Sequence, residues 1–161
     1  MTKSIPCALC KIYKDRNSTL FASTHFFCRF DDNPITPGHL IIVPKKHIVS
    51  LFDLSEAQWK DLRVILKKSS SLIKATNLKK FYSTLLMMRP DSVSTKYWRL
   101  MLKHKGISRR PDGYNIGINE GEAAGRTIHH VHIHLIPRYK GDVKNPRGGI
   151  RNIIPKLGNY R

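Results

Sequence analysis

The sequence has few acidic residues, few cysteines and no long apolar run. Eleven Asp and Glu residues stand against 29 Lys and Arg residues, which leaves a net charge of +18 at pH 7. No apolar stretch reaches the roughly 20 residues that a membrane helix needs, and the N-terminus has no signal-peptide core. Three cysteines, an odd number, argue against a disulfide framework. These absences predict a cytoplasmic protein without a membrane anchor.

The basic charge indicates anionic partners. A charge of +18 on a protein of this size concentrates polyanions around it. One nucleotide requires less positive charge, so RNA or DNA is a candidate partner beside a nucleotide. A basic proteome or simple solubility explains the charge equally well. The length of 161 residues predicts one domain, residues 1–161.

Histidines alternate with aliphatic residues over residues 128–137, in the order Ile-His-His-Val-His-Ile-His-Leu-Ile-Pro. This alternation predicts a β-strand in which His130, His132 and His134 project from one face and aliphatic side chains from the other. Three imidazoles without partners are costly to bury, so we expect them to line a site. Their ring nitrogens suit a metal ion or an anionic group such as phosphate.

The segment before these histidines favours phosphate. Residues 113–119 have the pattern of another strand, and residues 120–127 form a turn that contains Gly125. Small residues let backbone N–H groups approach a phosphate closely, and Arg126 and Thr127 add a charge and a hydroxyl.

Two motifs carry a resemblance to a known family. One is Asn119, the glycine-bearing turn and the run from His130 to Ile136, and the other is NPITPGHLIIVPKKH at 33–47. Together they resemble the signature of the histidine triad (HIT) superfamily of nucleotide hydrolases and transferases. The bacterial and archaeal diadenosine polyphosphate hydrolase-like members are the most similar in look. The resemblance implies an α+β fold with an antiparallel sheet of about five strands, one main helix and a homodimer.

The remaining pattern predicts compatible elements. β-Forming residues at 19–30 predict a pair of antiparallel strands, and the apolar run within 38–44 predicts a buried central strand. A capping box begins a helix over 55–73, whose apolar residues recur at helical spacing and include Trp59. We expect that apolar stripe to pack on the sheet.

Residues 76–110 are a basic insertion, because family members pass rapidly from the main helix to the next strand. We expect it to be helical at least over 96–103. Its cations and the aromatic residues Tyr97 and Trp98 either hold a nucleic acid, or its apolar residues dock it onto the domain and its charges face solvent. We prefer the second interpretation. Residues 138–161 form a basic tail for which little regular structure is expected.

The resemblance implies a role for each histidine. His132 is the nucleophile, which attacks the α-phosphorus and forms a covalent nucleotidyl-histidine. His134 donates a hydrogen bond to the α-phosphate or to the leaving oxygen, and His39, at the start of the central strand, orients the triad. His130 either joins this catalytic set or binds a metal. We expect a backbone carbonyl of a neighbouring strand to fix the tautomer of His132.

Other residues are implied to contact the nucleotide. Asp31 accepts hydrogen bonds from the ribose hydroxyls, although a role in stabilising its turn is an alternative. Asn119, the backbone of Gly125 and Thr127 stabilise charge on the phosphoryl oxygens. Arg126 stands where the family usually has glutamine, and a fixed cation there favours an anionic leaving group such as a polyphosphate.

Cys7 and Cys10 offer two thiolates to one Zn²⁺, which needs four ligands. The resemblance implies His47 and His130 as the other two. Zinc would then hold the N-terminus against the sheet as a structural ion. The alternative is an exposed pair of cysteines without metal.

These roles predict a hydrolase or nucleotidyl transferase that acts at the α-phosphate of a dinucleoside polyphosphate, of the diadenosine polyphosphate kind. One alternative is a nucleoside phosphoramidase. Another is a nucleic-acid-associated binding protein or DNA deadenylase that uses the basic insertion, and strong salt dependence of RNA or DNA binding would favour it.

Overall fold

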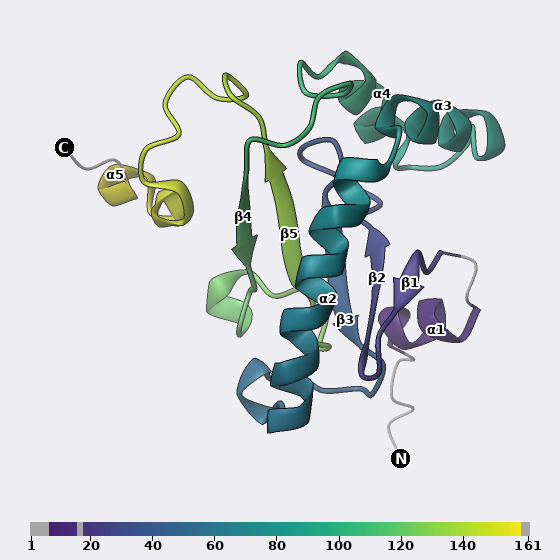
Figure 1. The fold of residues 1–161 in the computed structure, drawn as a ribbon. Coiled ribbons are helices and arrows are strands. Elements are labelled where there is room, and N and C mark those ends of the chain that lie inside the picture. Colours follow the sequence, from purple (N-terminus) through teal and green to yellow (C-terminus); the bar gives the residue numbers. More distant parts are fainter. Residues whose placement is uncertain (1–6, 16–17, 159–161) are drawn as a thin grey trace.

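A five-stranded antiparallel sheet organises the protein in the computed structural model, which describes residues 7–15 and 18–158 (Figure 1). The strands lie in the order β1-β2-β3-β5-β4. Their bounds are Phe21–Ala22 (β1), Phe26–Phe30 (β2), Leu40–Pro44 (β3), Gly113–Gly117 (β4) and Ile133–Arg138 (β5). The sheet and its helices confirm the α+β prediction, with β3 as the buried central strand.

Helix α2 (Glu56–Ala75) packs across one face of the sheet (Figure 1). Ser55 caps it, and both hydrogen bonds of the predicted capping box with Gln58 are present. Leu62 and Ile65 of α2 pack against apolar side chains of the sheet in one buried cluster. The prediction that Trp59 belongs to this stripe is wrong, because 45% of its surface is exposed.

Helix α1 (Ala8–Asp15) covers part of the opposite face. Its Leu9 packs with Phe27, Ile41 and Val43, and the ring of Tyr13 stacks on Phe27 at 5.0 Å. Side chains two residues apart on a strand share a face, so His39 and His134 lie on this same side of the sheet, beyond α1.

The segment before β5 departs from the predicted strand. Pairing begins only at Ile133, whereas the backbone bends at residues 128–130. The N–H of Val131 donates to the carbonyl of Ile48, outside the sheet ladder, and the N–H of His130 donates to the carbonyl of Ile128. The prediction of one strand from 128 to 137 is therefore wrong at its start. His130 does not project from the same strand face as His132 and His134, as the sequence had predicted.

The basic insertion forms helices α3 (Leu78–Met88) and α4 (Thr95–Lys103), which pack on each other and on the end of the sheet. Trp98 is fully buried there, and its indole N–H donates to the carbonyl of Asp32 at 3.2 Å. Because Trp98 is buried, it cannot stack on nucleic-acid bases. This agrees with the interpretation that the apolar residues of the insertion dock it onto the domain. That residues 1–161 form one domain with this segment as an insertion stays a prediction.

The tail contains more regular structure than expected. After β5, a 3-10 helix, η3, spans Gly149–Ile153, and a short helix, α5, spans Pro155–Gly158. Two further 3-10 helices are η1 (Leu51–Asp53) and η2 (Glu122–Ala124). The last residues of the predicted tail, 159–161, lie outside the described residues.

We predict that Tyr82→Phe destabilises the protein by about 1–3 kcal/mol, because it leaves the backbone N–H of Gly38 without its buried acceptor. The hydroxyl of Tyr82, on α3, accepts this hydrogen bond at 3.1 Å and so ties the insertion to the residue before His39. Urea unfolding measures the change. Tyr97→Phe is the control, since a phenyl ring keeps the contact with Lys96. Equal stability of Tyr82→Phe and the unmodified protein would contradict the prediction.

Candidate functional site

The side chains of His39, His134 and Asp31 meet at the ends of β3 and β2, beside β5. Nε2 of His39 lies 3.0 Å from Nδ1 of His134. Oδ2 of Asp31 lies 3.9 Å from each of these two nitrogens. The structure thus brings His134 beside Asp31 and His39, from which about a hundred positions separate it in the sequence. His132 completes the group because its ring lies 5.2 Å from that of His134.

His132 is held in one tautomer. Its Nδ1 lies 2.8 Å from the backbone carbonyl of His130, and a carbonyl only accepts, so Nδ1 carries the proton and Nε2 carries the lone pair. We expected a carbonyl from a neighbouring strand. The carbonyl instead belongs to the residue two positions earlier, in the bent segment that precedes β5.

His130 contributes its ring to a different group. Its Nε2–H donates to the carbonyl of Pro44 at 3.0 Å, which leaves the lone pair on Nδ1. That nitrogen lies 3.4 Å from Sγ of Cys7 and 3.5 Å from Sγ of Cys10. His47 joins them, with Nδ1 at 3.4 Å from Sγ of Cys10. The ring of His130 therefore lies with the thiols of Cys7 and Cys10, in a group that contains neither His132 nor His134.

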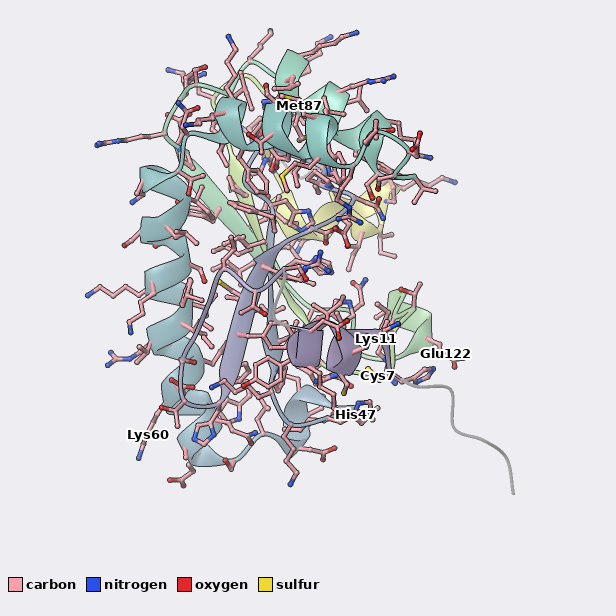
Figure 2. The ribbon with its side chains drawn as sticks, turned by 90° about the vertical axis from the view of Figure 1, so that its right-hand side faces the viewer. Cys7, Lys11, His47, Lys60, Met87 and Glu122 are labelled. Atoms are coloured by element: carbon pink, nitrogen blue, oxygen red, sulfur yellow. The ribbon has the colours of Figure 1, made fainter. Side chains whose placement is uncertain are left out.

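These four residues form a cluster that could bind a metal ion, and their ligand atoms all lie within 4.8 Å of one another. Figure 2 shows Cys7 and His47 on the same side of the molecule, beside α1. A tetrahedral zinc site with ordinary bond lengths places sulfur and nitrogen about 3.6 Å apart. The three sulfur–nitrogen separations of 3.4–3.5 Å are close to this value.

Burial keeps most of these imidazoles neutral. It lowers the pKa of His39 to about 4, although the nearby Asp31 raises it. Burial likewise lowers the pKa of His130 to about 4, with His47 adding to the effect. The pKa of His134 is lowered for the same reason. At neutral pH these rings therefore offer lone pairs and N–H groups, without positive charge.

Asp31 stabilises its turn, which was the alternative to a ribose contact in the sequence analysis. One carboxylate oxygen, Oδ1, accepts a hydrogen bond from the backbone N–H of Asn33 at 2.8 Å and stabilises the turn. The other, Oδ2, faces the histidines. Asp31 also borders a cavity of about 350 Å³ between the end of β2 and the insertion, where Phe81 and Trp98 are among the lining residues.

The residues expected around the phosphate are only partly brought together. Asn119 donates from Nδ2 to the carbonyl of Gly125 at 3.3 Å, and Gly125 has a φ of +86°, which favours glycine. Thr127 is exposed. The structure thus shows the Asn119–Gly125 turn, and leaves the phosphate contacts of these residues as predictions.

Arg126 is already paired. Its Nη1 donates to the carbonyl of Val49 at 2.9 Å and to Oε1 of Glu120 at 3.3 Å. Glu120 in turn accepts from the N–H of Leu51 at 2.8 Å. The charge of Arg126 is therefore balanced by a carboxylate, which weakens the expectation that it draws an anionic leaving group.

Two residues near the site were missed from the sequence. Arg29 is 6% exposed, borders the same cavity as Asp31 and donates to Asp32 at 2.7 Å. Arg29 lies on β2, two residues before Asp31, which directly follows the strand, and this spacing was the available signal. Phe81 comes from the insertion and gave no such signal, because the packing of α3 cannot be read from local spacing.

The sheet, its main helix and the paired histidines define a HIT-like α+β protein. The model of the HIT domain matches residues 14–141, and the chain belongs to this family. In the part of the chain that the structure describes, no helix is long and apolar enough to cross a membrane.

Similar proteins come from distant organisms. An uncharacterised HIT-like protein of Methanocaldococcus jannaschii is 26% identical over 150 residues, which is 91% of each chain. A bis(5'-adenosyl)-triphosphatase of Dictyostelium discoideum is 28% identical over 131 residues, or 81% of this chain and 66% of that protein. The solved structure of a zinc-bound histidine triad family protein of Mycobacterium smegmatis is 23% identical, with a TM-score of 0.56, and the match covers 95% of this chain and 90% of that one. The similarity to this solved structure shows that the two proteins share a fold.

Proposed function

We propose that this protein is a nucleotidyl transferase of the hydrolase type, which cleaves a dinucleoside polyphosphate at its α-phosphate through His132. The observation that carries the proposal is the hydrogen bond from Nδ1 of His132 to the carbonyl of His130, because it leaves Nε2 as the ring nitrogen that can attack phosphorus. The relative from D. discoideum, a bis(5'-adenosyl)-triphosphatase, supports this choice of substrate class over a phosphoramidate.

The reaction proceeds in two displacements. Nε2 of His132 attacks the α-phosphorus, the bond from phosphorus to the bridging oxygen breaks, and the remaining nucleotide leaves with both electrons of that bond. Water then attacks the same phosphorus, the bond from nitrogen to phosphorus breaks, and Nε2 regains its lone pair. Two nucleotides are released for each dinucleotide and water consumed.

The neighbouring residues position this chemistry. His134 faces the same side as His132 and is neutral at pH 7, so it serves as a hydrogen-bond donor to the α-phosphate or to the leaving oxygen. His39 holds His134 from behind at 3.0 Å. Asp31 directs Oδ2 toward this group and accepts from the ribose hydroxyls in our proposal, while Asn119, Gly125 and Thr127 supply the phosphoryl contacts.

We also propose that Cys7, Cys10, His47 and His130 hold one structural Zn²⁺. When bound, the ion would supply a cross-link between α1 and the segment before β5. The carbonyl of Pro44 sets the tautomer of His130 that such a ligand requires, which is the usual arrangement around zinc-bound imidazole. The reaction steps take place at other side chains.

The partners and location beyond the nucleotide stay predictions. A homodimer, a cytoplasmic location and contact with RNA or DNA belong to this group. Exposed cations on α2 to α4, among them Lys60 in Figure 2, favour nucleic-acid contact, since they take part in none of the salt bridges among described residues. The burial of Trp98 leaves Tyr97, which is half-buried, as the other aromatic residue of the insertion named for stacking.

Incubation with diadenosine tetraphosphate tests the proposed function. We expect release of mononucleotide products, separated by ion-exchange chromatography, and incorporation of ¹⁸O from labelled water into the nucleotide released in the second step. An adenosine phosphoramidate, run in parallel, is expected to turn over more slowly. Faster turnover of the phosphoramidate would make phosphoramidates the substrate class in place of dinucleoside polyphosphates. If neither compound is turned over, the enzymatic proposal is refuted.

A further inference from the structure

A second group of metal-ligand atoms lies among the residues that surround the nucleophile. Oδ2 of Asp31, Nε2 of His39 and Nδ1 of His134 form a triangle with sides of 3.0, 3.9 and 3.9 Å. The point equidistant from the three atoms lies about 2.1 Å from each, which is the bond length of Zn²⁺ to imidazole nitrogen and carboxylate oxygen.

The three donors are also set in place by their surroundings. Oδ1 of Asp31 accepts from the N–H of Asn33, so Oδ2 is the oxygen that remains for a ligand. His39 is 4% exposed and lies at the start of the central strand, whereas the side chains of His134 and Asp31 are 23% and 19% exposed. The group is thus fixed on its inner side and open to solvent on its outer side.

A proton between the two rings must move for both nitrogens to act as ligands. The 3.0 Å separation of Nε2 of His39 and Nδ1 of His134 requires one of them to carry that proton. Nδ1 of His39 has no hydrogen-bond partner among the described residues, so it is available to take the proton when Nε2 turns to an ion. The change breaks one hydrogen bond, which is the one between the two rings.

We infer that Asp31, His39 and His134 form a second, reversible site for a divalent first-row metal ion such as Zn²⁺ or Co²⁺. Two imidazoles and one carboxylate with remaining open positions are a ligand set that such ions accept. The site shares no residue with the cysteine cluster. This site has three protein ligands and the cysteine cluster has four, so we expect the second site to bind its ion more weakly than the cysteine cluster does.

The ion would remove Asp31 from substrate binding. Its ligation engages Oδ2 of Asp31, the oxygen that accepts from the ribose hydroxyls in the proposed function, so the nucleotide and the ion compete for this carboxylate. This consequence rests on the proposed function, whereas binding of the ion itself does not. At saturation we expect turnover to fall at least tenfold.

Cobalt spectroscopy tests the inference without any substrate. The protein is first loaded with one equivalent of Zn²⁺, which the cysteine cluster takes, and Co²⁺ is then titrated at pH 7.5. We expect one further equivalent to bind, with visible d–d absorption and without the near-ultraviolet charge-transfer band of a cobalt thiolate. Calorimetry of the same titration gives the dissociation constant.

Substitutions assign the second equivalent to its residues. Asp31→Asn and His39→Gln are each expected to weaken binding of the second Co²⁺ at least tenfold. Asp31→Asn replaces a carboxylate at a partly exposed turn by an amide of the same size. Asp32→Asn is the matched control, because the neighbouring Asp32 pairs with Arg29 and should leave binding unchanged. Circular dichroism verifies that each variant is folded.

The inference would be overturned by the absence of a second equivalent of Co²⁺ at 1 mM, or by unchanged binding in both Asp31→Asn and His39→Gln. A thiolate band from the second equivalent would assign it to the cysteines and would also overturn the inference. Because binding is measured without nucleotide, these results stay separate from a failure to hydrolyse diadenosine tetraphosphate.

Discussion

His132→Ala should lower turnover of diadenosine tetraphosphate by about 10³-fold or more, since it removes the atom that bonds to phosphorus. The protein should still bind nucleotide, because the other polar groups of the pocket stay in place. Single-turnover rates and equilibrium binding of adenosine monophosphate, measured together, separate chemistry from affinity.

His129→Ala is the matched control for this substitution. His129 lies in the same bent segment but is exposed, so its removal should change the rate less than threefold. Mass spectrometry of rapidly quenched wild-type protein should detect an acid-sensitive nucleotidyl adduct on the peptide that contains His132. Wild-type turnover in His132→Ala would show that another group is the nucleophile.

The sequence predicts the sheet well because its strands follow simple rules. β-Forming residues over β2 and a continuous apolar run over β3 predict strands, and both strands are buried on both faces. The capping box at Ser55 is local as well, so the start of α2 could be placed to the residue. Trp59 shows the limit of helical spacing as a predictor. The spacing indicates which face of α2 is buried, but not which residues at the border of that face are exposed.

Alternation fails where a backbone hydrogen bond leaves the sheet. The sequence from 128 to 137 alternates throughout, yet Val131 bonds to the carbonyl of Ile48 and the strand begins only at Ile133. That bond depends on a segment about 80 positions away, which spacing cannot report. The bend separates the two uses of the histidines: the ring of His130 goes to the thiols, and its carbonyl goes to His132.

Charge also has to be assigned from contacts rather than from residue type. Arg126 appears in the sequence as a fixed cation beside the phosphate turn, but Glu120 and the carbonyl of Val49 hold it in the structure. In the insertion, composition left open whether Trp98 stacks on bases or docks. Its burial against the sheet favours docking, and Tyr82 strengthens the attachment through Gly38.

Cys10→Ser should abolish binding of the structural zinc and lower the free energy of unfolding by about 4 kcal/mol, when free zinc exceeds its dissociation constant about a thousandfold. Cys10 contacts both His47 and His130, so its loss removes a ligand that adjoins each imidazole. Zinc content per chain and urea unfolding in buffered zinc measure the effect. Cys28→Ala is the control, because this buried cysteine lies in the core under α2 and should leave one zinc per chain.

The same variant should slow catalysis although zinc enters no reaction step. The thiols and the carbonyl of Pro44 hold the ring of His130, and the backbone carbonyl of His130 fixes the tautomer of His132. A more mobile His130 would therefore let His132 adopt the other tautomer. We expect turnover to fall about tenfold with little change in nucleotide affinity, since the residues that contact nucleotide are elsewhere. Full activity in a zinc-free, folded Cys10→Ser protein would show that Pro44 and the backbone hold His130 by themselves.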